Sequence, residues 1–117
     1  MVTAVRGATT VEFDTESDTI DRVLELVDNL FESNKLEEFN IISIIFSVTD
    51  DLVAINPAAA LRAKGGYGDY PLFCTQEPKS IGALKQAIRV LITWNGDGTK
   101  GIPCYLHNAK VLRPDLV

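Results

Sequence analysis

One long amphipathic segment limits what this chain can fold into more than any other feature. Between residues 20 and 31, apolar side chains recur at helical spacing on an otherwise acidic stretch: Ile20, Val23, Leu24, Val27, Leu30 and Phe31. Just before them, Thr15-Glu16-Ser17-Asp18 supplies a capping hydroxyl and acids for a first helical turn. The pattern predicts a helix over about residues 17–33, with Asn34 as a left-handed stop. Its apolar stripe must be covered by another layer of the protein.

Short β-branched and apolar runs predict that this other layer is a β-sheet. Residues 40–49 are typical of a strand buried on both faces. Further strands are predicted at residues 2–5, 72–75, 87–94, 104–106 and 109–112, the first stopping at Arg6-Gly7 and the last at Pro114. Pro57 predicts a short helix over residues 58–64 that Gly65-Gly66 ends. A helical turn is expected at residues 80–84 and a flexible turn at residues 95–98.

Together these elements predict an α+β fold, a mixed β-sheet with one long helix plus short helical turns. We expect a single domain over residues 1–117, which is near the common domain size. One helix of this length cannot cover both faces of such a sheet. The second face is therefore expected to meet another copy of the chain, so we predict an oligomer.

Composition and charge exclude several classes of function. The net charge of −5 argues against a nucleic-acid-binding protein, and the apolar runs are too short to span a membrane. The first residues lack the basic and apolar regions of a signal peptide, so a cytoplasmic location is expected. Cys74, Cys104 and the single His107 do not form a metal-binding set, and we predict no metal and no cofactor.

The usual catalytic motifs are also missing from the sequence. There is no GxSxG, no GxGxxG and no P-loop, and nothing in the sequence orients a Cys–His pair. An acidic protein can still bind an anion if its few cations are concentrated in one place. Of the five arginines, Arg22 falls on the solvated face of the predicted helix. The other four, Arg6, Arg62, Arg89 and Arg113, are the candidates.

Arg89 is the most informative of these arginines because it interrupts an apolar strand, between Ile88 and Val90. Its charge must reach solvent, pair with a carboxylate or line a polar cavity. Arg6 and Arg113 stand at strand ends, where solvation is the simplest interpretation. Glu77 suits an exposed loop equally well, and Tyr105 suits core packing with its hydroxyl at the rim.

Four stretches, spread from residue 5 to residue 116, resemble the AroH-class chorismate mutases in the family's order. They are Val5-Arg6-Gly7-Ala8-Thr9-Thr10-Val11-Glu12, Cys74-Thr75-Gln76-Glu77, Ile88-Arg89-Val90-Leu91, and Tyr105-Leu106 with Leu112-Arg113-Pro114-Asp115-Leu116. The resemblance implies a small trimeric enzyme of the α/β-barrel type. It would convert chorismate to prephenate in aromatic amino-acid biosynthesis, without a cofactor.

The resemblance also implies roles for individual residues. Arg6 and Tyr105 would hold a substrate carboxylate, and Arg89 would reach a carboxylate and the ether oxygen of the breaking bond. Glu77, with Cys74 beside it, would accept a hydrogen bond from the ring hydroxyl. Arg62 and Arg113 would sit at the pocket mouth, and Phe73 and Leu112 are implied as further substrate-binding positions. The sites would lie between subunits, with residues 56–77 of one chain facing Arg6, Arg89 and Tyr105 of a neighbour.

Two departures from the family pattern, at Asn56 and Ala59, fall at the expected pocket edge, where we expect altered affinity rather than lost chemistry. Two other functions stay open at this point. One is a YjgF/RidA-like imine deaminase, a small trimer with an interfacial arginine. The other is a trimeric protein that binds a small acid without converting it.

Overall fold

The long helix is present, and local hydrogen bonds define its two ends. In the computed structural model, which describes residues 1–63, 66–67 and 69–116, α1 covers Glu16–Asn34. The Thr15 side chain caps it by accepting a hydrogen bond from the Asp18 amide at 3.2 Å. Lys35, not the predicted Asn34, is the left-handed residue, with a φ of 51°. Asn34 stays helical, and its side chain binds the backbone amide and carbonyl of Ile102.

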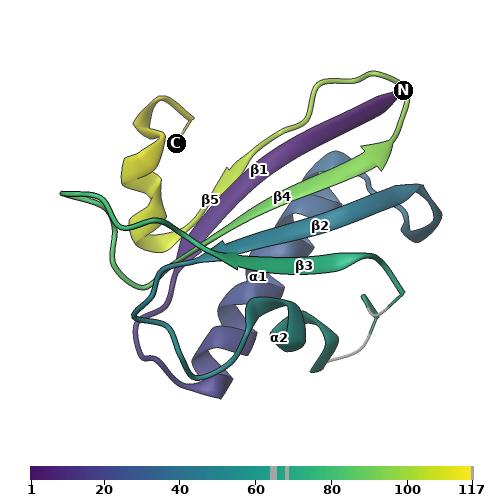
Figure 1. Ribbon diagram of the computed structural model, residues 1–117. Helices are drawn as coiled ribbons and strands as arrows, with labels where there is room; N and C mark the ends of the chain where they lie inside the picture. Colours follow the sequence, from purple (N-terminus) through teal and green to yellow (C-terminus); the bar gives the residue numbers. More distant parts are fainter. Residues whose placement is uncertain (64–65, 68, 117) are drawn as a thin grey trace.

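Five strands form one mixed sheet in the order β3-β2-β4-β1-β5 (Figure 1). Their bounds are β1 Val2–Thr10, β2 Ile41–Val48, β3 Leu72–Gln76, β4 Ala87–Asn95 and β5 Cys104–Tyr105. Strand β4 pairs antiparallel with β1 and β2, whereas β1–β5 and β2–β3 are parallel. The prediction of an α+β fold with a mixed sheet is confirmed.

Strand β1 is longer than its sequence pattern predicted. It was expected to stop at Arg6-Gly7 but continues to Thr10, because every residue from Val2 to Thr10 pairs with β4. Gly7 allows the strand to pass through a crowded place. A Cβ there would lie 2.9 Å from the Cys104 carbonyl oxygen and 2.9 Å from a methyl carbon of Leu30. The glycine thus marks close packing rather than a strand end.

The strand predicted at residues 109–112 is wrong. This segment belongs to a 3₁₀ helix, η2 (His107–Leu112), and Pro114 begins a second one, η3 (Pro114–Leu116). His107 has a φ of 53°, which turns the chain out of the extended β5. Once turned, the Ala109 amide bonds to the Leu106 carbonyl at 3.0 Å and starts the 3₁₀ helix.

Two shorter helical segments were predicted with mixed success. Helix α2 covers Pro57–Ala63 and begins at the predicted proline. The Asn56 side chain accepts a hydrogen bond from the Ala58 amide at 2.8 Å and caps its start. Its predicted end at Lys64 and Gly65 lies outside the described residues. Where a helical turn was predicted, at residues 80–84, the structure has a single hydrogen-bonded turn at residues 81–82, closed by the Ala83 amide on the Ser80 carbonyl. Residues 38–40 form a 3₁₀ turn, η1 (Glu38–Asn40).

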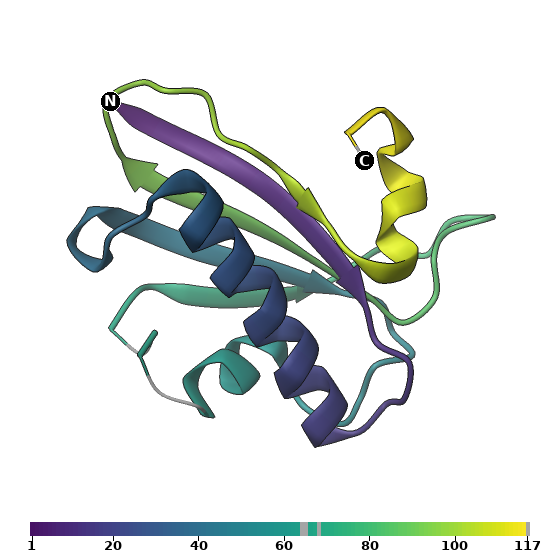
Figure 2. The same cartoon turned by 180° about the vertical axis from the view of Figure 1, so that it is seen from behind.

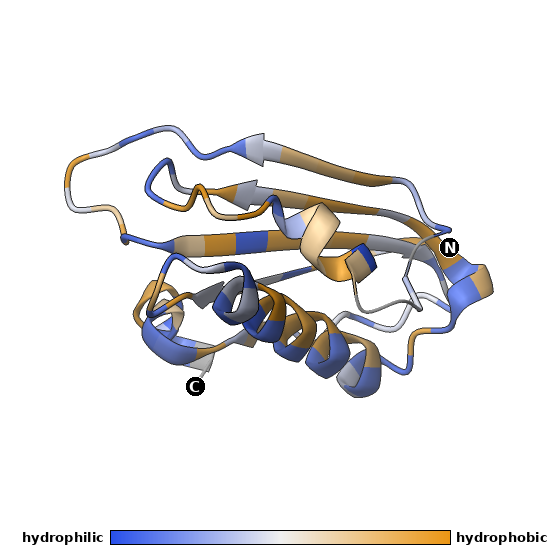
Figure 3. Ribbon diagram, turned by 90° about the horizontal axis from the view of Figure 1, so that it is seen from below, coloured by the Kyte–Doolittle hydropathy of each residue, from blue (hydrophilic) through white to orange (hydrophobic). Residues whose placement is uncertain are grey.

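Both α-helices cover the same face of the sheet (Figure 2), and the other face, turned to the viewer in Figure 1, is open. Helix α1 alternates between hydrophilic and hydrophobic segments, whereas the strands are largely hydrophobic (Figure 3). The prediction that β2 is buried on both faces is wrong for this chain. Phe46 is fully buried beneath the helices, but Ile45 on the open face is 38% exposed. No helix among the described residues is long and apolar enough to cross a membrane.

The prediction that Arg22 lies on the solvated face of α1 is only partly right. It is half-buried, and its guanidinium donates a hydrogen bond to the Thr10 carbonyl at 3.1 Å. The long side chain lies along the protein surface and reaches the end of β1.

Candidate active site

The open face of the sheet carries most of the residues that the sequence singled out. Side chains of paired residues point to the same face, so the strand register defines rows that cross the sheet. One row contains Thr75, Ser47, Arg89, Ala8 and Tyr105. The neighbouring row contains Phe73, Ile45, Leu91 and Arg6. Residues from all five strands therefore meet on one surface.

Arg89 and Glu77 form an ion pair on this surface. The Arg89 Nε lies 3.0 Å from Oε2 of Glu77, whose side chain is 19% exposed. The Ser47 hydroxyl donates to the other carboxylate oxygen, Oε1, at 2.8 Å. The Glu77 amide in turn bonds to the Val48 carbonyl at 2.8 Å, which fixes the residue at the end of β3. Both oxygens of the carboxylate are thus engaged, and the guanidinium is held in one orientation.

Ser47 is a residue that the sequence reading missed. It stands in the β-branched run of β2, two positions from Ile45, and this alternation could have placed it on the same face as Arg89. Its hydroxyl gave no signal by itself, because a single serine within a strand forms no recognisable motif. Only the register with Arg89 connects it to the site.

A hollow of about 190 Å³ lies beside the ion pair. It is lined by Arg6, Gly7, Ala8, Ile45, Phe46, Ser47, Arg89, Val90, Leu91 and Tyr105. Within the part of the chain that the structure describes, the Arg6 guanidinium has no ion-pair partner. Two guanidinium groups and a phenol therefore line one small hollow of a protein with a net charge of −5. Such a surface is suited to a small anion.

Tyr105 and the C-terminal segment close one side of the site. Tyr105 is 9% exposed and packs with Ala8, Ala109 and Leu112. Arg113 makes a two-pronged contact with Asp115, with Nε–Oδ1 and Nη2–Oδ2 distances of 3.1 and 2.9 Å. This contact raises the pKa of Arg113 and lowers the pKa of Asp115. In this arrangement Arg113 does not line the hollow.

Some predicted site residues are not brought to this hollow within one chain. Arg62 is exposed on α2, on the helix-covered side of the sheet. The Cys74 side chain packs against the core instead, and burial raises its pKa. Phe73 is on the open face and 64% exposed, but it does not line the hollow. Glu77 reaches Arg89 of its own chain, whereas the resemblance implied that it would face a neighbour's Arg89.

The fold and the site define a small α+β protein with an arginine-lined, open sheet face. The family model for chorismate mutase type I matches residues 2–116. Two curated relatives are chorismate mutases AroH. The one from Bacillus subtilis is 37% identical, covering 99% of this chain and 93% of the relative. The one from Thermus thermophilus is 38% identical, covering 99% and 97%.

The chain is also similar in structure to a solved chorismate mutase. A chorismate mutase from Clostridium thermocellum superposes with a TM-score of 0.85 at 40% identity, covering 92% of this chain and 97% of that one. The chain belongs to the chorismate mutase type I family. Neither alternative, the imine deaminase nor the non-catalytic binding protein, is supported by these comparisons.

Proposed function

We propose that this protein is an isomerase that converts chorismate to prephenate in the biosynthesis of aromatic amino acids. The observation that carries the proposal is the joint position of Arg6, Arg89 and Tyr105 around one hollow, with Glu77 paired to Arg89. Membership of the chorismate mutase type I family supports the choice of substrate.

The reaction suits a site built from fixed charges. One carbon–oxygen bond breaks, one carbon–carbon bond forms, and no proton has to move. The enzyme must select the compact form of a flexible dianion and stabilise negative charge that develops on the ether oxygen. A guanidinium serves both purposes because it is permanently charged and donates through a planar fork.

The proposed roles follow from this requirement. Arg6 and Tyr105 bind a substrate carboxylate, and Arg89 reaches a carboxylate and the ether oxygen. Glu77 accepts a hydrogen bond from the ring hydroxyl and, through its contact with the Arg89 Nε, orients that guanidinium. A donor that is already oriented needs no reorganisation as charge develops, which is why the ion pair favours the transition state.

We further propose a homotrimer with active sites between subunits. The hollow in one chain, at about 190 Å³, is smaller than the roughly 300–1,000 Å³ of most ligand sites. Phe73, Ile45 and Leu91 leave apolar surface on the open face, with exposures of 64%, 38% and 37%. A neighbouring chain that covers this face would complete the site and bring residues such as Arg62, Cys74 and Phe73 to it. Leu112 and Arg113 would lie at the mouth. We also propose a cytoplasmic location.

The decisive experiment is to mix the purified protein with chorismate and follow the loss of its ultraviolet absorbance. Prephenate should form in proportion to enzyme, above the rate with heat-denatured protein. If chorismate binds but its absorbance does not fall faster than in that control, the protein is a binding protein and the proposal fails. Mass measurement in solution tests the trimer separately.

A further inference from the structure

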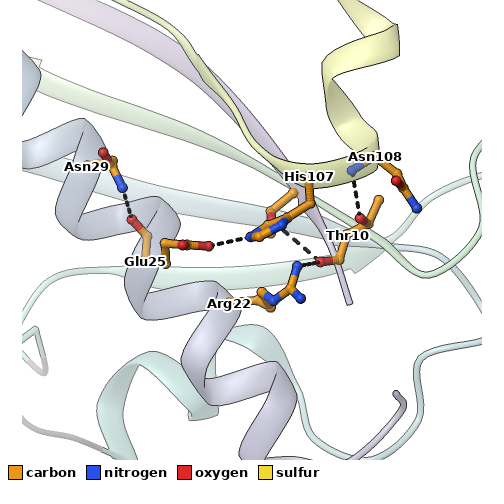
Figure 4. Close-up of polar contacts among 7 residues, drawn as sticks. Thr10, Arg22, Glu25, Asn29, His107 and Asn108 are labelled. Atoms are coloured by element: carbon orange, nitrogen blue, oxygen red, sulfur yellow. Dashed lines mark hydrogen bonds and ion pairs between the residues drawn. The ribbon is translucent and has the colours of Figure 1, made fainter. Parts of the chain in front are cut away.

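Two side chains of α1 contact the place where β1 ends and η2 begins (Figure 4). Glu25 Oε1 lies 2.7 Å from Nε2 of His107, the first residue of η2. One turn earlier, Arg22 donates to the Thr10 carbonyl at 3.1 Å. Since a carboxylate can only accept, the His107 ring donates in the first contact.

Thr10 connects these contacts to η2. Its carbonyl accepts from Arg22, and its hydroxyl oxygen accepts from the Asn108 amide at 3.1 Å. The Leu106 amide bonds to the Ala8 carbonyl at 2.9 Å on the other side of His107. The turn that carries His107 is therefore fixed to β1 before and after this residue, and to α1 through its side chain.

His107 needs such support because its backbone is strained. Its φ of 53° is in the left-handed region, which residues with a Cβ rarely adopt unless the surroundings hold them there. The conformation matters for the site, because the chain turns here two residues after Tyr105. This turn lets η2 place Ala109 and Leu112 against Tyr105 and Ala8.

We propose that Glu25 and His107 are positioning residues for the active site: their contact holds the left-handed turn and thereby keeps Tyr105 in place at the hollow. Neither residue lines the hollow, so they act through Tyr105 and not on the substrate. The inference rests on the proposed function for its kinetic test, but not for its structural test.

The kinetic test compares Glu25→Ala with Glu25→Gln. Tyr105 is proposed to bind a carboxylate that is present in both the substrate and the transition state. Loosening it should therefore raise KM by about three- to tenfold and leave kcat within about twofold. Glu25→Gln keeps an oxygen that can accept from His107, and its KM should stay close to that of the wild type. Equal impairment in both variants would contradict a hydrogen-bonded contact.

One substitution of His107, alone and combined with Glu25→Ala, separates the role of its backbone from that of its side chain. Asparagine tolerates the left-handed region well but is too short to reach Glu25, so His107→Asn should behave like Glu25→Ala. Adding Glu25→Ala to His107→Asn should then change KM no further, since the shared contact is already lost. Additive effects of the two substitutions would overturn the proposal.

A structural test needs no substrate. Exchange of the Leu106 and Asn108 amide hydrogens should become about tenfold faster in Glu25→Ala, because their hydrogen bonds flank the released turn. The matched control is Glu32→Ala, an exposed acid on the same helix. It should change neither exchange nor KM. If the wild type does not convert chorismate, the proposed function fails, and amide exchange alone decides this inference: unchanged exchange in Glu25→Ala would overturn it.

Discussion

At the scale of single residues, Arg89 illustrates how a strand places a charge where it is useful. Ile88 and Val90 on either side are buried beneath the helices, so alternation turns Arg89 to the open face. The sequence left three possibilities for it, and the structure shows all three: its side chain is exposed, has a carboxylate partner and lines the hollow. The identity of the partner could not be predicted, because Glu77 reaches Arg89 only through the pairing of β2 with β3 and β4.

Arg89→Lys is expected to be nearly inactive although the positive charge is kept. Lysine donates from a single point and cannot contact both Glu77 and the ether oxygen through a planar fork. The loss of one oriented donor at a developing oxyanion costs roughly 3–4 kcal/mol, or about 10²–10³ in kcat. Chorismate turnover by the purified variant measures this. A near-normal kcat would contradict the proposed contact between Arg89 and the ether oxygen.

Ser47→Ala tests whether the orientation of Glu77 matters. The substitution removes the hydroxyl that donates to Oε1 at 2.8 Å and leaves the ion pair with Arg89 in place. Since a hydrogen bond to a charged group contributes about 1.5–3 kcal/mol, kcat/KM should fall by about ten- to a hundredfold. Ser43→Ala is the matched control, a serine on the same face of β2 that does not line the hollow. Unchanged kcat/KM in Ser47→Ala would show that Arg89 alone orients the carboxylate.

At the scale of elements, the sequence predicted what depends on local pattern and failed where distant contacts decide. Helix α1 and strands β2, β3 and β4 were predicted within one or two residues, because periodicity and β-branched runs are local signals. Strand β1 was predicted too short because Gly7 serves close packing against Leu30 and Cys104. The 3₁₀ helix η2 was taken for a strand because its start depends on the turn at His107, which contacts α1 far away in the sequence.

The cap of α1 can be tested with a pair of neighbouring substitutions. Thr15→Ala removes the side-chain oxygen that accepts from the Asp18 amide at 3.2 Å. This should lower the free energy of unfolding by about 1 kcal/mol, as for other lost helix caps. Ser17→Ala is the control, since this residue is exposed in the same turn and does not cap the helix. Urea unfolding of both variants measures the difference, and equal stabilities would contradict the capping role of Thr15.

At the scale of the whole molecule, the one-sided helix layer is the feature with the widest consequences. The helices cover one face of the sheet and form the hydrophobic core with it. The other face is left with a cationic hollow and exposed apolar side chains. The sequence predicted an uncovered face from the number of helices alone. It could not predict which strand residues would share that face, since this depends on the register of five strands.

Stability of the whole molecule should decrease at alkaline pH. Burial is the main cause that raises the pKa of four groups above their ordinary values of 9.0 for cysteine and 10.0 for tyrosine: Cys74, Cys104, Tyr67 and Tyr70. For Tyr67 a hydrogen bond with Asp28 adds to this effect. The folded protein therefore keeps these protons at pH values where the unfolded chain has already lost them.

The sign of the effect follows from this difference in bound protons. Below about pH 8 these four groups are protonated in both the folded and the unfolded state, so their contribution to the free energy of unfolding does not change with pH. As pH rises above 9, the unfolded state loses protons first, so the free energy of unfolding falls. Urea midpoints measured between pH 7 and 11 should decrease over this range, and Tyr67→Phe should show a weaker decrease because it has no hydroxyl to ionise. Midpoints that stay constant up to pH 11 would mean that these groups ionise equally readily in the folded protein.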